Sequence, residues 1–232
     1  DYGRGIPLGK VKEVASDVNT GGKFDSKNFQ KSVGLNGVGL KAVNALSTHC
    51  TVQSVRAGKM VTVKFEKGDL TEQTPPEDTR EPNGTIVTFT PDPLLFENYR
   101  FRPETVEMMV NNYTYLNTGL QMLLNGKKYQ SRSGLLDLIK DAMARDRRPD
   151  PLYPIIHLKG EDIEVVLTHT DQNGEEYYSF VNGQHTTQGG THLTAFREHV
   201  CRTIKEFSGK GYEFSDIRSG MVAAVSVRVQ EP

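Results

Sequence analysis

The chain has 232 residues, of which 36% are hydrophobic and 25% are charged, and its formal net charge is -1. This length and composition are ordinary for one or two globular domains. The near-neutral charge excludes a strongly basic field over the whole molecule, so any contact with nucleic acid has to be local. No run of about 18 apolar residues is present, which excludes a membrane-spanning helix.

Two glycine motifs stand near the start of the chain. The first is Asp1-Tyr2-Gly3-Arg4-Gly5-Ile6-Pro7 and the second is Gly34-Leu35-Asn36-Gly37-Val38-Gly39. Helical spacing of apolar residues predicts a helix over residues 8–18, the polar residues 21–33 predict a long loop, and a second helix is expected over 40–46. A carboxylate can accept a hydrogen bond from a base and glycine amides can wrap phosphates, so the two motifs predict a nucleotide pocket.

Alternating β-branched and aromatic residues predict strands over residues 51–55, 59–66 and 85–89, with a proline-rich, acidic loop over 72–82. A helix is expected to begin at Pro103 and to stop before Gly119. Asn125-Gly126 between two short apolar or charged runs is a hairpin signal. Another short helix is predicted over residues 135–143.

The charged stretch from Arg145 to Pro151 is the best domain boundary in the chain. Beyond it we predict strands over residues 163–168 and 177–181, joined by a turn at 171–174, and a final strand over 221–229. A strong amphipathic helix opens at Thr191. Its apolar stripe consists of Leu193, Phe196, Val200, Ile204 and Phe207.

No metal site is predicted. Cys50 and Cys201 lie far apart and match no ligand spacing, which indicates a reducing compartment and two small buried side chains. His185, His192 and His199 recur every seven residues, but no Cys, Asp or Glu cluster joins them in zinc spacing.

Taken in order, the motifs resemble a known family. Asp-x-Gly-x-Gly-Ile-Pro, a loop with Gly-Gly-Lys-Phe and Gly-Leu-Asn-Gly-Val-Gly are similar to the GHKL (Bergerat-fold) ATPase module, and more narrowly to the ATPase subunit of bacterial type IIA DNA topoisomerases. Phe180-Val181-Asn182 and Gly189-Gly190-Thr191-His192-Leu193 resemble that family's transducer domain. The implied fold is α+β: an N-terminally truncated GHKL sandwich over residues 1–148, then a βαβ-type transducer over residues 149–232.

The resemblance also implies roles for individual residues. Asp1 would accept a hydrogen bond from the adenine amino group of ATP, often with a bridging water between Asp1 and the base. Thr85 would bind that same water. Residues that would approach or line the adenine side are Gly3, Arg4, Gly5, Ile6 and Pro7. The phosphate loop would consist of Gly34, Leu35, Asn36, Gly37, Val38 and Gly39, with Lys23 near the phosphates. Ile6 could equally be a simple core residue, and Lys23 a solvated loop cation.

For the whole subunit, the resemblance implies an ATP-driven gate for DNA strand passage in the cytoplasm. Its partners would be DNA, a second B subunit and a topoisomerase A-type subunit in an A2B2 complex, with no membrane. The family's general-base glutamate and Mg²⁺-binding asparagine precede the Asp1 motif, and its switch lysine follows the last residues. We therefore expect no catalytic residue and no metal ligand in this chain, and little ATP hydrolysis by it.

Several alternatives stay open. Asn36, Lys41 and the Asp-Tyr-Gly opening favour a topoisomerase IV B subunit over a DNA gyrase B subunit. A GHKL chaperone or a mismatch-repair ATPase would share the Asp and glycine motifs, although the Gly-Gly-Thr-His-Leu stretch argues against both. A binding domain without ATPase activity, with incidental glycine loops, is the least specific alternative.

Overall fold

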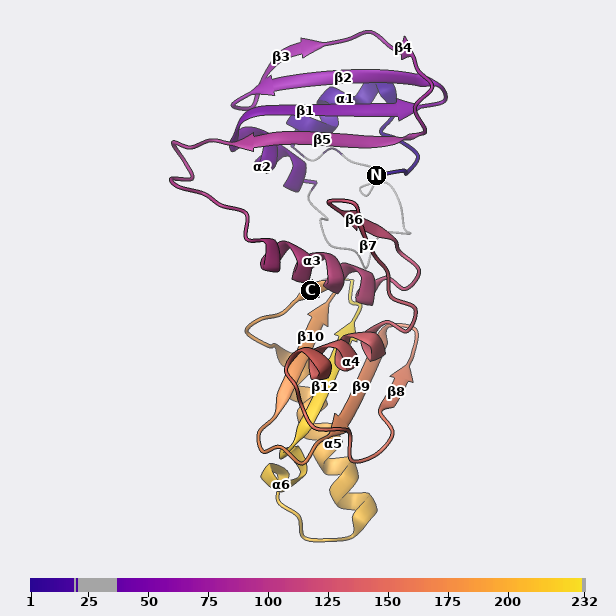
Figure 1. The fold of residues 1–232 in the computed structure, drawn as a ribbon, viewed down its shortest axis with the longest axis vertical. Coiled ribbons are helices and arrows are strands. Elements are labelled where there is room, and N and C mark those ends of the chain that lie inside the picture. The colour runs from indigo at the N-terminus through magenta and orange to yellow at the C-terminus, as the bar shows by residue number, and fades with distance from the viewer. Residues whose placement is uncertain (19, 21–36, 231–232) are drawn as a thin grey trace. The chain divides into compact units, whose positions relative to one another are not determined.

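The computed structural model describes residues 1–18, 20 and 37–230. Clustering of contacts divides the chain into two compact units, one of which ends at Arg100 while the other begins at Phe101 (Figure 1). Among the described residues, no helix combines the length and apolar character needed to cross a membrane.

The first unit is built on an antiparallel sheet with the strand order β3-β2-β1-β5, and β4 pairs with the far end of β2. Its strands are β1 (Ser47–Arg56), β2 (Lys59–Glu66), β3 (Asp69–Gln73), β4 (Glu77–Asp78) and β5 (Gly84–Pro91). The prediction of a loop over residues 72–82 was wrong in part, because the end of β3 and the two residues of β4 add exposed edges to β2. Exposed acidic edge strands carry no apolar alternation, so the sequence pattern does not reveal them.

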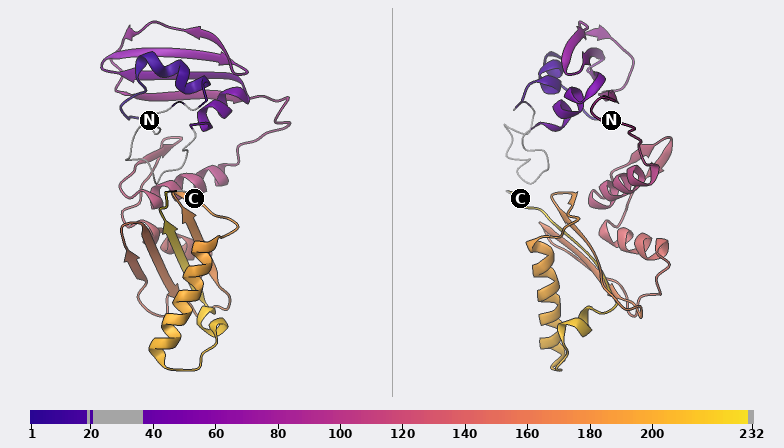
Figure 2. Two further views of the ribbon diagram at one scale, coloured as in Figure 1. Left: turned by 180° about the vertical axis from the view of Figure 1, so that it is seen from behind. Right: turned by 90° about the vertical axis from the view of Figure 1, so that its left-hand side faces the viewer.

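One face of this sheet is covered by helices, which Figure 2 shows from behind. They are the 3₁₀ turn η1 (Leu8–Lys10), α1 (Val11–Ser16) and α2 (Gly39–Ala45). Val11 and Ala15 of α1 pack on the inward-facing side chains of β1 and β2, among which Phe65 is only 1% exposed. The alternation predicted over residues 59–66 is confirmed, since Val61, Val63 and Phe65 are all buried.

The second unit contains a mixed sheet with the order β11-β10-β12-β9-β8. Its strands are β8 (Ile156–Lys159), β9 (Ile163–His169), β10 (Glu176–Val181), β11 (Gln184–His185) and β12 (Met221–Val227). β10 and β12 are parallel and are joined through α5 (Thr191–Ser208) and α6 (Phe214–Arg218), which is a βαβ unit. Strands β9 and β10 are consecutive in sequence, but β12 pairs between them.

Helices lie on both faces of this sheet, as the right-hand view of Figure 2 shows. On one face, α4 (Leu135–Arg145) packs against Phe180, Val166 and Val222, and α3 (Pro103–Leu116) contributes Tyr115 and Leu116 at the rim. On the other face, α5 and α6 cover Val165, Leu167 and Val225. Cys201 is the fully buried residue of α5, whereas Phe207, which the predicted stripe included, is 94% exposed.

A two-stranded hairpin of β6 (Met122–Leu124) and β7 (Lys127–Tyr129) follows α3. Its turn residues Asn125 and Gly126 have φ of 50° and 82°. Positive φ at both central positions is the geometry that an Asn-Gly turn favours, so the hairpin prediction is confirmed.

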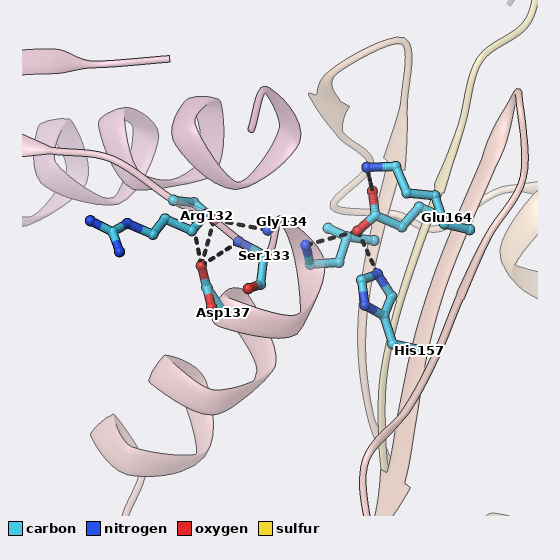
Figure 3. Close-up of polar contacts among 9 residues, drawn as sticks. Arg132, Ser133, Gly134, Asp137, His157 and Glu164 are labelled. Carbon is cyan, nitrogen blue, oxygen red and sulfur yellow. Dashed lines mark hydrogen bonds and ion pairs between the residues drawn. The ribbon is translucent and has the colours of Figure 1, made fainter. Parts of the chain in front are cut away.

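The N-terminus of α4 is held by two carboxylates (Figure 3). Asp137 Oδ2 accepts hydrogen bonds from Ser131 Oγ, Arg132 N and Ser133 N at 2.8, 3.0 and 2.9 Å. Burial raises the pKa of Asp137, but these hydrogen bonds outweigh it, so the net shift of the pKa is downward. Glu164 of β9 accepts from Leu135 N at 3.2 Å and pairs with His157 at 3.0 Å, which ties the helix to the sheet.

The compact units do not coincide with the domains expected from the sequence. Residues 101–148 belong to the second unit, because α4 supplies Leu135, Leu138 and Ile139 to a core shared with the second sheet. The charged stretch after α4 is therefore a connection within that unit. The assignment of the family's ATP-binding and transducer domains to residues 1–148 and 149–232 stays a prediction.

Candidate functional site

The first glycine motif lies along the ends of β1 and β5. The nitrogen of Asp1 donates to Thr85 O at 2.8 Å, and Thr85 N donates back to Asp1 O at 3.3 Å. Thr85 itself stands opposite Ser54 in the β1–β5 register. Asp1 and Thr85, which lie 84 positions apart in sequence, are thus brought side by side by backbone pairing.

Gly5 occupies a position that has no room for a side chain. Its φ is 72°, and a β-carbon there would lie 2.3 Å from Val55 O. Next to it, Ser54 Oγ donates to Ile6 O at 2.7 Å, which fixes the motif against β1. The close approach of two backbones at Gly5 explains why this position is a glycine.

The Asp1 side chain is exposed, and its Oδ1 accepts a hydrogen bond from Gly3 N at 2.8 Å. An ionised carboxylate has acceptor sites on both oxygens, so this bond leaves capacity for a donor outside the chain. Asp1 is therefore oriented by Gly3 and by its pairing with Thr85 while it still presents an acceptor to solvent.

The other residues of the first motif divide between core and surface. Ile6 is half-buried and packs against the core of the first unit, as the simple core interpretation expects. Arg4 and Pro7 are exposed, and Pro7 O accepts from Lys10 N at the start of η1. Arg4 and Pro7 are therefore accessible to solvent near Asp1 in the sequence. Ile6 anchors the segment by packing against the core.

Of the second motif, the structure describes Gly37, Val38 and Gly39. Gly37 has φ of 56°, and Val38 is the N-cap residue of α2, with its carbonyl accepting from Ala42 N at 2.9 Å. The motif therefore turns into a helix as the sequence predicts. The remaining predicted residues lie outside the described part of the chain: Lys23, Gly34, Leu35 and Asn36.

Sequence reasoning missed the buried polar face of α2. Lys41 and Asn44, one helical turn apart, are 9% and 2% exposed. Lys41 Nζ donates to Val14 O at 3.0 Å and Asn44 Nδ2 to Ala15 O at 3.2 Å, so both side chains satisfy carbonyls at the end of α1. Burial lowers the pKa of the Lys41 ammonium, and the negative charge of Asp17 partly counteracts this. The spacing i, i+3 of the lysine and the asparagine places both on one face of the helix, and this spacing was the sequence signal for a shared polar face.

Imidazole, thiolate and carboxylate side chains are the usual protein ligands of metal ions. Nowhere in residues 1–18, 20 and 37–230 do three His, Cys, Asp or Glu side chains gather in a way that could hold a metal ion.

The chain is similar in sequence to known proteins. The family model for DNA gyrase B matches residues 124–232. The B subunit of DNA topoisomerase 4 from Borreliella burgdorferi is 44% identical over 232 residues, which are 100% of this chain and 38% of that protein. The DNA gyrase B subunit of Archaeoglobus fulgidus is 34% identical over 258 aligned residues, with 100% of this chain and 40% of that protein covered. The chain thus spans about two fifths of the length of these relatives.

Solved structures show the same fold. The 43K ATPase domain of Thermus thermophilus gyrase B, solved in complex with an aminocoumarin, matches 98% of this chain and 66% of that chain with a TM-score of 0.67 and 28% identity. The ATPase region of Saccharomyces cerevisiae topoisomerase II matches with a TM-score of 0.76 at 21% identity, covering 98% and 63% of the two chains. The predicted α+β fold, a GHKL module followed by a βαβ unit, is confirmed.

Proposed function

Because the chain belongs to the family of type IIA DNA topoisomerase B subunits, we propose that its first unit binds the adenine and phosphates of ATP. Residues 149–232 would form the family's transducer domain, which couples the nucleotide state to the opening and closing of the DNA gate. Within the family, topoisomerase IV B is the preferred identity, supported by the 44% identity to the Borreliella burgdorferi protein, and DNA gyrase B is the alternative.

The observation that carries the proposal is the pairing of Asp1 with Thr85. Backbone hydrogen bonds in both directions hold the two residues together, and Gly3 N orients the Asp1 carboxylate. A base amino group is a donor, so an oriented and exposed carboxylate is a suitable acceptor for it. The hydroxyl of Thr85 beside it would share a bridging water with the base.

The second motif would complete the pocket on the phosphate side. Gly37 and Gly39 leave backbone amides uncovered by side chains, which suits close approach of an anion. Gly34, Leu35, Asn36 and Lys23 are proposed members of the same phosphate-binding set on the basis of their match to the family motif.

Binding alone does not supply hydrolysis. Attack of water on the γ-phosphate requires a positioned general base and charge stabilisation, and the proposed base-binding and phosphate-binding residues include neither. We therefore expect the isolated chain to release phosphate from ATP slowly or not at all. Rapid release by the purified polypeptide would contradict this assignment.

The wider setting follows from the family. The proposed partners are DNA, a second B subunit that associates in the presence of ATP, and a topoisomerase A-type subunit, and the proposed location is the cytoplasm. Magnesium would accompany the bound ATP, since Mg²⁺ is commonly held through substrate phosphates together with one or two protein groups.

The decisive experiment is calorimetric titration of the chain with ADP and with a non-hydrolysable ATP analogue. Asp1→Asn keeps the size of the side chain but replaces one acceptor oxygen by a donor NH₂ group, so it should abolish measurable binding. The control is Asp69→Asn, an exposed change on β3 of the same unit, which should bind as the wild type does. Equal binding by the wild type and the Asp1 variant would overturn the proposal.

A further inference from the structure

Lys41 stands two residues after the last glycine of the second motif. A lysine in that position could be interpreted as a phosphate ligand, because glycine-rich phosphate loops commonly end in a lysine whose ammonium reaches the phosphates. The geometry of this side chain points to a different role.

The ammonium of Lys41 is surrounded by backbone carbonyls. Nζ lies 2.5 Å from Gly37 O, 3.0 Å from Val14 O and 3.2 Å from Thr20 O. A lysine ammonium has three N–H donors and no acceptor, so three carbonyl partners occupy its whole capacity. The residue is 9% exposed, which also limits access of an anion to the charge.

These three carbonyls come from separate stretches of the first unit. Val14 belongs to α1, Thr20 is the last described residue before the gap at 21–36, and Gly37 is the first described residue after it. One ammonium therefore joins the end of α1 to both described flanks of that gap. A buried charge is tolerated only when its hydrogen bonds are made, so this bonding favours one arrangement of the three segments.

Resting on the proposed function, we propose that Lys41 is a positioning residue for the nucleotide phosphates and not a ligand of them. It holds Gly37 in the turn that presents the second glycine motif, and its own charge stays on the backbone carbonyls. The Asp1–Thr85 pair, which reads the base, has no bond to Lys41 and is independent of it.

The test compares ligands with and without phosphates. Lys41→Met keeps the length of the side chain and removes its donors, and Lys12→Met, on the exposed face of α1, is the matched control. In Lys41→Met the affinity for a non-hydrolysable ATP analogue should fall about tenfold or more, by analogy with the loss of metal affinity when the hydrogen-bond partners of metal ligands are removed, whereas the affinity for adenosine stays within about twofold. Lys12→Met should leave both affinities unchanged. Equal affinities of Lys41→Met and wild type for the analogue would overturn the proposal.

Amine labelling of the wild-type chain separates positioning from direct contact, even if Lys41→Met fails to fold. With acetic anhydride and mass spectrometry, Lys41 should react slowly compared with the exposed Lys12, both without nucleotide and with the ATP analogue bound. Fast labelling without nucleotide that becomes slow with it would identify Lys41 as a phosphate ligand and overturn the proposal. If the wild type binds neither adenosine nor the analogue while Lys41 is still protected, the proposed nucleotide function fails, and this inference fails with it.

Discussion

A β-carbon added to Gly84 would lie 2.1 Å from the carbonyl oxygen of Asp1. Real β-carbons do not approach a backbone oxygen so closely, so any side chain at Gly84 has to displace the first glycine motif from β5. The absence of a side chain at one strand residue is therefore a condition for the placement of the proposed base-reading carboxylate.

We predict that Gly84→Ala weakens nucleotide binding without unfolding the sheet. The backbone conformation of Gly84 suits alanine, because its φ is not in the left-handed region, so the clash with Asp1 is the main effect. Such overpacking lowers the free energy of unfolding by about 1–3 kcal/mol. Displacement of Asp1 should also lower the adenosine affinity measured by titration calorimetry roughly tenfold or more. Gly9→Ala is the control, since a β-carbon at Gly9 meets no atom within 4 Å.

The hydrogen bonds to Asp137 predict a pH-dependent stability. Because its pKa is lower in the folded chain than in the unfolded chain, Asp137 contributes stability above the unfolded value of about 3.9, and this is lost as the pH falls through the folded value. Asp137→Asn should therefore cost about 1 kcal/mol near neutral pH, as loss of a helix cap does, and progressively less in acid.

Urea denaturation at several pH values measures this difference. Asp150→Asn, an exposed change after α4, serves as the control and should shift the free energy of unfolding little at any pH. A deficit of Asp137→Asn that stays constant down to strongly acidic pH would contradict the role given to the ionised carboxylate.

Phe180 and Phe207 provide a matched pair for the second unit. Phe180 is fully buried between α4 and the sheet, while Phe207 at the end of α5 is 94% exposed. Phe180→Ala should lower the free energy of unfolding by about 3–5 kcal/mol, because it leaves a large cavity. Phe207→Ala should change it by less than about 0.5 kcal/mol. Guanidinium denaturation followed by circular dichroism compares the two, and similar losses would place Phe207 in a packed contact.

The two cysteines should be unreactive in the folded chain. Cys50 is 1% exposed and Cys201 is fully buried, and burial raises the pKa of both thiols, against a smaller opposing effect of Arg218 on Cys201. Since the thiolate is the reactive form, Ellman's reagent should modify neither at an appreciable rate until denaturant is added. Rapid modification of one thiol in native buffer would show that its segment opens readily.

Local patterns predicted the fold where the structure depends on local chemistry. The Asn125-Gly126 hairpin and the strand with Val61, Val63 and Phe65 are such elements, because turn conformation and the alternation of buried residues are written in adjacent positions. Helix α5 was likewise predicted from the glycines before Thr191 and from its apolar spacing, whereas the βαβ arrangement around it was expected only from the family resemblance.

Features that depend on pairing between distant strands could not be predicted from the sequence. The insertion of β12 between β9 and β10 follows from a crossover through α5, which no local signal encodes. Phe207 fits the periodicity of α5 but lies in its last turn and is exposed, which periodicity alone does not reveal. For the candidate site, the resemblance named Asp1 and Thr85, which backbone pairing brings together, whereas the proposed role of Lys41 depends on the carbonyls of three residues that only the structure places around it.

Each buried apolar cluster of the described residues is confined to one compact unit. Two-state analysis holds for one cooperative core, so a free energy of unfolding is defined for each unit, and the values predicted above for Asp137 and Phe180 refer to the second unit. The sequence has no tryptophan, but each unit holds one buried thiol: Cys50 in the first and Cys201 in the second. Pulsed thiol labelling would thus report two melting events by residue, and nucleotide should delay only the one that exposes Cys50.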